Sequence, residues 1–543
     1  MTTASVKKKR RLIYNYDAWA PFYDCKWTGV DSTKAALTSL RASIDLIAGS
    51  QVTTVALCPN VGQSVNYPSA VSELCQWRPL SPEAAATLSK TMGESFAQIT
   101  RGISDLWRVQ GIDAYGVLVE HAAQRGLEVF ATIRMNDVHM VDMEAGQGPY
   151  TDAFYRAHPE WRLWAGQSRH AAGGLNYAVP EVRAHRLAMF EELLRRYDLA
   201  GLELDFLRGA PFFPGDYAAS AGENSGRINF RQDFAEASAP SMTAFVEEVR
   251  AMTRRVAKEK GREIILCARV PSSLSGCRRV GLDPVAWHQR GCLDFITVGR
   301  FLQVYFDLPL AEYKRALPGL PVHASIDYIV GGAYVDRYLY ARDNSAEIYR
   351  AAAAALYAQG ADGLTLFNMF AARVNGNDPQ GKNWNHLEPL EVLQELGDPA
   401  TLEDRDKLYL VDATFKIFDL RFFDCHAALP VVTAPDSPLL VKMILAEKAP
   451  EKRKLRLRVV LESAVAGVAL LVQLNGHTQG TGKPVTEGHL FPEPYDQKPP
   501  LPEHCLDFTV AAECLNYGAN EIAVLASAPV TVVSIELAVT NRS

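Results

Sequence analysis

The sequence predicts an α/β fold: a (β/α)8 TIM barrel over residues 1–400, followed by an all-β sandwich of the jelly-roll kind over residues 405–543. Several helical segments end at a glycine, such as Gly126 or Gly261, and a short apolar run follows within a few residues. Glycine ends helices because it accepts the left-handed backbone conformation needed there, so this pattern is the helix-to-strand half of a βα unit. Eight apolar runs of this kind occur before residue 400, and short alternating strands replace the helical pattern after about residue 405.

The eight strands expected for the barrel are the short apolar runs that alternate with helical segments. They lie at residues 11–17, 53–59, 128–136, 201–207, 263–270, 294–301, 321–327 and 363–369. Between them, Pro180 opens a helix over 181–197, and the alanine-rich segment 345–359 carries one apolar stripe. A doubly wound open sheet is the alternative. No G-x-G-x-x-G motif opens a helix after a strand, so dinucleotide binding loses support.

The C-terminal quarter of the chain predicts almost only strands. They are expected at residues 408–418, 439–445, 455–461, 468–474, 505–510, 521–525 and 530–539, with a proline-rich loop over 491–502. Segment 515–522, after the turn at 474–476, resembles the end of galactose-binding-like sandwiches that are attached to sugar enzymes. Sandwiches bind many ligands or none, so this resemblance implies a carbohydrate-binding module only as an expectation.

Composition places the chain among ordinary globular proteins, with 48% hydrophobic and 22% charged residues among 543. A net charge of −6 argues against a nucleic-acid or anionic-membrane partner, and no apolar stretch approaches the length of a membrane helix. The basic run at residues 7–11 precedes a segment too short and polar for a signal peptide. Nine scattered cysteines without a C-x-x-C pair suit a reducing compartment, so we expect a cytoplasmic protein.

Two acids are expected at the C-terminal ends of the barrel strands, where functional groups of such barrels lie. On the fourth strand Glu203 and Asp205 alternate with apolar residues and therefore face inward, and Asp327 ends the seventh strand. Glycoside hydrolysis needs one group that protonates the departing oxygen and one that attacks the sugar or activates water. We expect Asp205 and Asp327 to be this pair, with Glu203 as the reserve. The structural alternatives are that Arg134 neutralises Glu203, and that Asp327 orients His323 or caps the following helix.

Further polar and aromatic residues at strand ends and in the following loops are candidates for holding a hydroxyl-rich ligand. They are Asn15, Asp17, Arg134, Asn136, Asp137, His139, Arg269, Arg300, Tyr305 and Asn368. No His, Asp or Glu cluster has metal-ligand spacing, so neither a catalytic metal nor a cofactor is expected. The absence of a G-x-S-x-G elbow and of a P-loop removes support for an esterase or an NTPase.

Three segments in sequence order resemble a bacterial family of glycosyl-hydrolase-like barrels, glycosyl-hydrolase-like 10. They are the HPEW turn at 158–161, the LNYAVPEVR helix start at 175–183 and the strand segment YDLAGLELD at 197–205. The resemblance implies a carbohydrate-active barrel in which Asp205 matches the family's acid on strand four. Ala200 and Phe206 stand where family members commonly have Asp, and Leu207 occupies the glutamate position of the chitinase pattern D-x-x-D-x-D-x-E.

The leading hypothesis is thus a glycoside hydrolase acting on an oligo- or polysaccharide. Two alternatives remain open: a barrel without chemistry that binds a glycan, and a lyase or isomerase whose Arg134, Arg269 and Arg300 bind a sugar acid. Whether hydrolysis retains or inverts the anomeric configuration depends on the separation of the carboxylates, which the sequence leaves open. A homo-oligomer is a further possibility, because such sandwiches often pack on a barrel or on a neighbouring copy.

Overall fold

The computed structural model of the chain describes most of the barrel and the sandwich. The described residues are 10–18, 32–76, 90–139, 150–163, 173–209, 211–214, 232–327, 329–330, 342–343, 345–369, 389–412, 429–463, 467–485, 490–491 and 504–541, of which a few within helices and strands are described by their backbone only.

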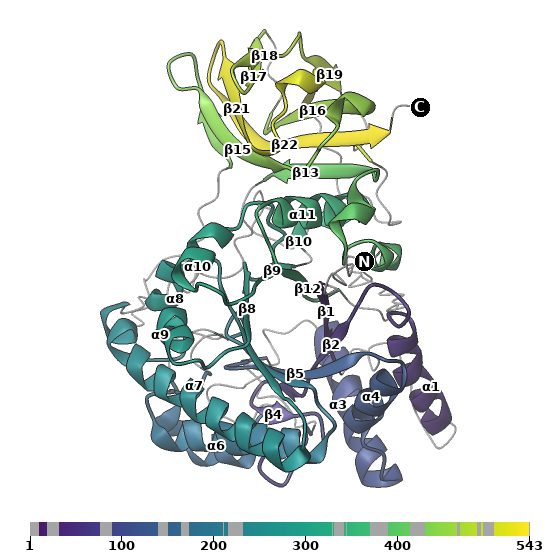
Figure 1. Ribbon diagram of the computed structural model, residues 1–543, viewed down its shortest axis with the longest axis vertical. Coiled ribbons are helices and arrows are strands. Elements are labelled where there is room, and N and C mark those ends of the chain that lie inside the picture. Colours follow the sequence, from purple (N-terminus) through teal and green to yellow (C-terminus); the bar gives the residue numbers. More distant parts are fainter. Residues whose placement is uncertain are drawn as a thin grey trace, which may run out of the picture.

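Eight parallel strands close into a barrel, which confirms the predicted fold and excludes the open sheet (Figure 1). In chain order they are β1 (Arg11–Asp17), β2 (Thr54–Cys58), β5 (Glu128–Arg134), β6 (Gly201–Asp205), β7 (Ile265–Pro271), β8 (Phe295–Gly299), β9 (Val322–Ile326) and β12 (Gly363–Leu366). The ring closes because β1 pairs with both β2 and β12. All eight predicted strands are confirmed, with ends that differ by a few residues.

Helices surround the strands, as Figure 1 shows. They are α1 (Ser32–Asp45), α3 (Lys90–Gln110), α4 (Ala114–Gln124), α5 (Ala153–Ala157), α6 (Pro180–Arg196), α7 (Gln232–Lys260), α8 (Leu274–Arg279), α9 (Pro284–Gln289), α10 (Leu310–Ala316) and α11 (Ala346–Ala358). Two predicted helices are confirmed: α6 has Pro180 in its first turn, and α11 buries most of its alanines. None of the helices in the described part of the chain is long and apolar enough to cross a membrane.

The barrel interior changes from apolar to polar along its axis. Toward the N-terminal ends of the strands, Ile13, Ala56, Phe130, Cys267 and Phe295 form a separate apolar cluster, in which the two phenylalanine rings stack with centroids 6.4 Å apart. This cluster fills the floor of the barrel. The inward residues beyond it are polar, so chemistry is confined to the mouth, by which we mean the end of the barrel where the strands terminate.

The C-terminal residues form two antiparallel sheets. The larger one contains β13 (Lys407–Val411), β14 (Val431–Thr433), β16 (Arg453–Leu461), β19 (Lys483–Val485), β20 (Cys505–Thr509) and β22 (Val530–Asn541). The smaller one contains β15 (Leu439–Leu445), β17 (Leu470–Leu474), β18 (His477–Thr478) and β21 (Gly518–Ala526). All seven predicted strands are present, although the second half of the expected 408–418 strand lies outside the described residues. The strands β14, β18 and β19 were not predicted, because two or three residues carry no periodic signal.

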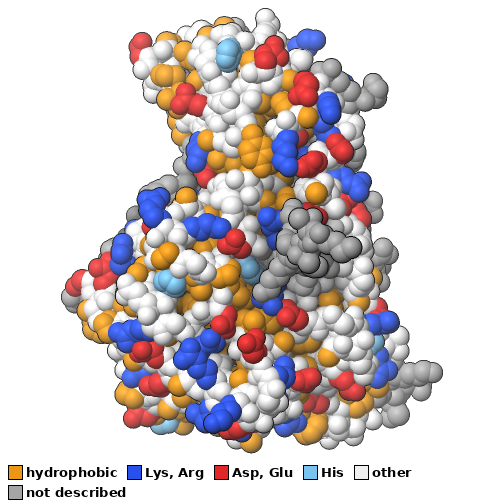
Figure 2. Space-filling model, viewed as in Figure 1, with side chains coloured by type: hydrophobic (Ala, Val, Ile, Leu, Met, Phe, Trp, Pro, Cys, Tyr) orange, Lys and Arg blue, Asp and Glu red, His pale blue; other side chains and the backbone are white. Residues whose placement is uncertain are grey.

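The sandwich lies beside the barrel wall rather than over the mouth (Figure 1). Its strands β13 and β15 contact α11. The ring centroids of Phe306 and Tyr409 are 6.3 Å apart across this junction, and Lys442 Nζ lies 3.1 Å from Asp307 Oδ2. On the face shown in Figure 2, acidic and basic side chains are interspersed over both parts.

Candidate functional site

Two of the predicted acids meet on one arginine at the mouth. Arg269 on β7 donates from Nη1 to both carboxylate oxygens of Asp205, at 3.1 and 3.2 Å, and from Nη2 to both oxygens of Asp327, at 3.0 and 2.8 Å. All three side chains are buried, with at most 1% of each exposed. The guanidinium therefore lies between the two carboxylates and fixes their relative position.

Neighbouring groups hold this arrangement from both sides. The ring of Phe367, which follows β12, lies 3.7 Å from the Arg269 guanidinium carbon. Asp327 accepts two further hydrogen bonds, from the Ser325 hydroxyl at 2.6 Å and from the Leu302 N–H at 2.7 Å. Leu302 adopts a positive φ of 63°, a conformation that a non-glycine residue keeps only where its surroundings enforce it. Burial raises the pKa of Asp327 and outweighs the opposing effects of Arg269 and Ser325.

Glu203 lies on the same face of β6 as Asp205, one layer deeper in the barrel. Its Oε1 accepts a hydrogen bond of 2.7 Å from the Thr132 hydroxyl, whereas its buried Oε2 accepts none from the described residues. Burial and the charge of Asp205 raise the pKa of Glu203 to about 7. The expected structural alternative, neutralisation by Arg134, is wrong.

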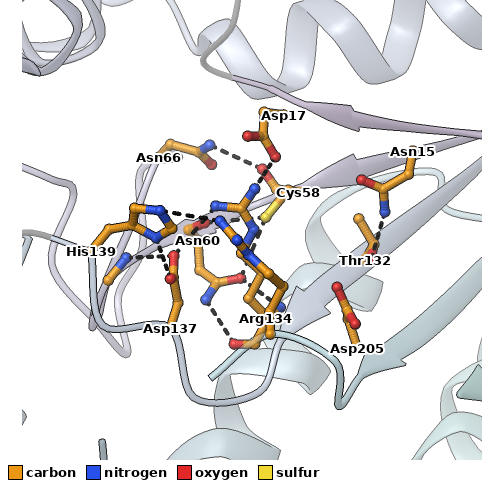
Figure 3. A network of polar contacts seen from close by, with 12 residues as sticks. Asn15, Asp17, Cys58, Asn60, Asn66, Thr132, Arg134, Asp137, His139 and Asp205 are labelled. Atoms are coloured by element: carbon orange, nitrogen blue, oxygen red, sulfur yellow. Dashed lines mark hydrogen bonds and ion pairs between the residues drawn. The ribbon is translucent and has the colours of Figure 1, made fainter. Parts of the chain in front are cut away.

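Arg134 instead joins two other carboxylates in a second network at the mouth, drawn in Figure 3. It donates to Asp17 at the end of β1, and its Nη1 lies 3.4 Å from Asp137 Oδ2. The side chain of Asn60 holds the backbone of Arg134 in place, donating to its carbonyl at 3.0 Å and accepting from its N–H at 3.1 Å. The predicted residues Asp17 and Arg134 are thus brought together in an ion pair, and Arg134 pairs with Asp137 as well.

His139 completes this second network and is its most exposed member. Its Nδ1 is hydrogen-bonded to Asp137 Oδ1, and its Nε2 lies 3.1 Å from Arg208 Nη2. Since the guanidinium can only donate, Nε2 accepts this bond and Nδ1 donates to Asp137. Burial raises the pKa of Asp137, but His139 and Arg134 outweigh it and hold that pKa well below its ordinary value. About 35% of the His139 side chain is exposed, so a ligand can reach it.

The other predicted ligand-binding residues differ in how far their polar groups are used. The Asn136 side chain donates to the carbonyl oxygens of Leu175 and Pro211 and accepts from the Leu175 N–H, at 2.7–3.0 Å, and so joins two loops. Asn15 donates to the Thr132 hydroxyl at 3.3 Å. Arg300 stacks on Tyr305, with its guanidinium carbon 3.5 Å from the ring centroid.

Some buried polar atoms at the mouth have no hydrogen-bond partner within the described residues, as do others elsewhere in the chain. At the mouth and in the layer below it they are Asn66 Oδ1, Glu203 Oε2, Arg208 Nε, Arg300 Nε, Arg300 Nη1 and Asn368 Oδ1. Asn368 also has a positive φ of 56°. Buried polar groups in native proteins are normally paired, so a ligand or water can complete those that line the mouth.

One residue of the second network, Arg208, escaped the sequence analysis. It lies just beyond β6 with no motif around it, and its position at a strand end was the available signal. His323, suggested as a partner of Asp327, instead lies in the barrel floor, where its ring stacks on Phe295 with centroids 4.3 Å apart. In the part of the chain that the structure describes, no three His, Cys, Asp or Glu side chains are grouped to hold a metal.

Comparison with known proteins gives a distant structural similarity to glycoside hydrolases built on (β/α)8 barrels. No family model matches the chain, and no curated protein matches it. An endo-β-1,4-mannanase from Thermotoga petrophila is similar in structure with 10% identity and a TM-score of 0.43, covering 97% of this chain and 98% of that one. A family GH18 chitinase from Chromobacterium violaceum has 12% identity and a TM-score of 0.36, covering 98% and 88%. The chain also matches 53% of the chitinase ChiW from Paenibacillus sp., with 96% of its own length, 12% identity and a TM-score of 0.35. These similarities concern the fold, and no site residue is transferred from them.

Proposed function

We propose that this protein is a glycoside hydrolase in which Asp205 is the reacting carboxylate. The observation that carries the proposal is the pair of inward carboxyl groups on β6. Glu203 is unpaired at Oε2 among the described residues and has a pKa of about 7, while Asp205 is surrounded by donors that suit a carboxylate. Glycoside hydrolysis uses two carboxyl groups, one of which gives a proton to the departing oxygen, and the raised pKa of Glu203 suits that donor.

Counting acceptor positions favours Asp205 over Asp327 as the reacting group. A carboxylate offers about four lone-pair positions. Asp327 accepts four hydrogen bonds, two from Arg269 and one each from Ser325 and Leu302. Asp205 accepts three, two from Arg269 and one from the Leu207 N–H at 3.0 Å, which leaves a position on its Oδ2. In this proposal Asp327 is a positioning residue that anchors Arg269.

The unpaired polar atoms at the mouth support a sugar as the ligand. Asn66 and Asn368 present buried carbonyl oxygens, which sugar hydroxyls satisfy as donors. The resemblance of segments 158–161, 175–183 and 197–205 to glycosyl-hydrolase-like barrels supports the same substrate class.

The test is product release from a panel of neutral and acidic oligosaccharides by the wild type, Asp205→Asn and Asp362→Asn. Asp362 precedes β12 at the opposite end of the barrel, so its variant controls for the loss of a carboxylate as such. We expect hydrolysis by the wild type and Asp362→Asn, and a loss of about 10²–10⁴-fold in Asp205→Asn. Turnover that is indifferent to Asp205→Asn would overturn the assignment, and glycan binding without turnover in all three proteins would identify a binding protein.

A second candidate function is a lyase or isomerase acting on a sugar acid. The Asp137–His139 pair favours it, because Asp137 orients the imidazole and the Nε2 that now accepts from Arg208 can remove a proton if Arg208 turns to the carboxylate of the substrate. An unsaturated or rearranged product, formed from uronic acids alone and abolished in His139→Gln but not in Asp205→Asn, would select this function over hydrolysis.

A further inference from the structure

Among the described residues, four arginines at the mouth concern us, of which two pair with carboxylates and two do not. Arg134 bridges Asp17 and Asp137, and Arg269 bridges Asp205 and Asp327. Each of these groups combines one cation with two anions, so neither attracts a further anion. This excludes two of the arginines that the sequence suggested as ligands of a sugar acid.

Arg208 and Arg300 are different, because neither forms an ion pair with a described carboxylate. Arg208 is 8% exposed, its single hydrogen bond goes to His139, and its Nε has no partner. Arg300 is half-buried, and both its Nε and its Nη1 are buried without a partner. Three buried guanidinium donors at the mouth thus have no partner among the described residues, and a ligand that accepts hydrogen bonds would complete them.

Aromatic rings orient both guanidinium groups. The guanidinium carbon of Arg208 lies 5.2 Å from the ring centroid of Phe301, and that of Arg300 lies 3.5 Å from the centroid of Tyr305. A guanidinium that rests on a ring presents its N–H edge sideways, where it can form the parallel pair of hydrogen bonds that carboxylates accept. Because Phe301 directly follows Arg300 in the chain, the contact of Arg208 with Phe301 brings the two arginines into one neighbourhood.

We propose that Arg208 and Arg300 form a subsite for an acidic sugar, with a uronic-acid carboxylate as its ligand. The exposed imidazole of His139 lies at its edge and marks the side from which the sugar enters. Burial and the charge of Arg134 lower the pKa of Arg208 and outweigh the opposing effect of the nearby carboxylates Asp137, Asp17 and Asp205, so a bound anion would favour its charged form further. The inference rests on the proposed function for the reaction that follows binding, but the subsite itself is a matter of affinity.

The test compares the binding of a uronic-acid oligosaccharide with that of its methyl ester, which has nearly the same shape without the charge. The proteins are the wild type, Arg208→Gln, Arg300→Gln and the control Arg290→Gln, whose guanidinium is exposed and pairs with Glu247 on the barrel exterior. We expect the wild type and the control to bind the acid on the order of tenfold or more tighter than the ester, because charge-assisted hydrogen bonds carry the difference. Each single variant should lose most of this preference, while its affinity for the ester changes little.

A further variant and a further ligand distinguish the ways in which the inference could be wrong. Arg208→Lys keeps the charge and should retain part of the preference, which a merely structural role of Arg208 would not produce. If a sulfated oligosaccharide binds and the uronic acid does not, the assignment of a carboxylate as the ligand is wrong, although the two arginines still form an anion subsite. Equal binding of acid and ester by the wild type overturns the inference, even if Asp205-dependent hydrolysis of a neutral glycan is found. Conversely, Arg-dependent binding of the acid without hydrolysis supports the subsite and contradicts the proposed function.

Discussion

Replacing Glu203 by glutamine tests the electrostatics of β6 without changing the shape of the side chain. The pKa of Glu203 is about 7 in the folded barrel, against an ordinary value of 4.5. The folded state therefore binds this proton more tightly than the unfolded chain does. The stabilisation is complete below pH 4.5 and is lost as pH rises through 7. At about 1.4 kcal/mol per pKa unit, the loss amounts to about 3 kcal/mol.

Glutamine does not titrate, so the difference in unfolding free energy between the wild type and Glu203→Gln carries this term alone. Between about pH 5 and about pH 8, we expect the wild type to lose roughly 2–3 kcal/mol of unfolding free energy relative to Glu203→Gln. Urea unfolding followed by tryptophan fluorescence is the assay, because all eight tryptophans precede residue 385 and report on the barrel rather than the sandwich. The exposed Glu263 provides the control variant Glu263→Gln, whose difference from the wild type should stay flat. A flat difference for Glu203→Gln as well would refute the reasoning.

Three further predictions concern the stability of the barrel floor, around His323, and of the mouth, around Arg269 and Gly209. Burial lowers the pKa of His323 to about 3 from an ordinary 6.5, so its contribution to stability is lost as pH falls through this window. Between about pH 7 and pH 5, the unfolding free energy of His323→Phe should therefore fall by about 2 kcal/mol less than that of the wild type in the same urea assay. An equal fall in the two proteins would contradict this. Arg269→Met leaves two buried carboxylates unpaired and should cost about 3–5 kcal/mol at neutral pH, whereas a cost below about 1 kcal/mol would show that the bridge is not formed. At Gly209, where φ is +87°, an added Cβ would lie 1.6 Å from the carbonyl oxygen of Asn136, so Gly209→Ala should abolish the thermal transition of the barrel. Gly126→Ala, with φ of +78° and open space, should cost only about 1–2 kcal/mol, and equal effects of the two substitutions would contradict the close approach.

The sequence was sufficient for the strands and for the direction of their side chains. Local periodicity determines both, because a strand buried on two sides alternates between the helix layer and the barrel interior. The inward placement of Glu203 and Asp205, and the arrival of Asp327 at the mouth, followed from this alternation alone.

The pairing of charges at the mouth could not be predicted in the same way. Arg134 was expected to hold the ligand, with pairing to Glu203 as the structural alternative, but it binds Asp17 and Asp137. Arg269 was expected to hold a sugar but bridges two of the predicted acids. Which cation meets which carboxylate depends on the stagger of neighbouring strands and on side-chain length, and neither is encoded in a local pattern.

The most direct test of the account is the turnover number of Asp205→Asn on a glycan that the wild type hydrolyses. We expect kcat to fall by about 10²–10⁴-fold while the affinity for the glycan stays close to that of the wild type. Because Asp205 pairs with the buried Arg269, the variant should be less stable than the wild type, so its tryptophan-monitored unfolding must show that it is folded under the assay conditions. Asp327→Asn should lower kcat less than Asp205→Asn does, since its carboxylate acts through Arg269. Turnover by Asp205→Asn at the wild-type rate would contradict the central claim.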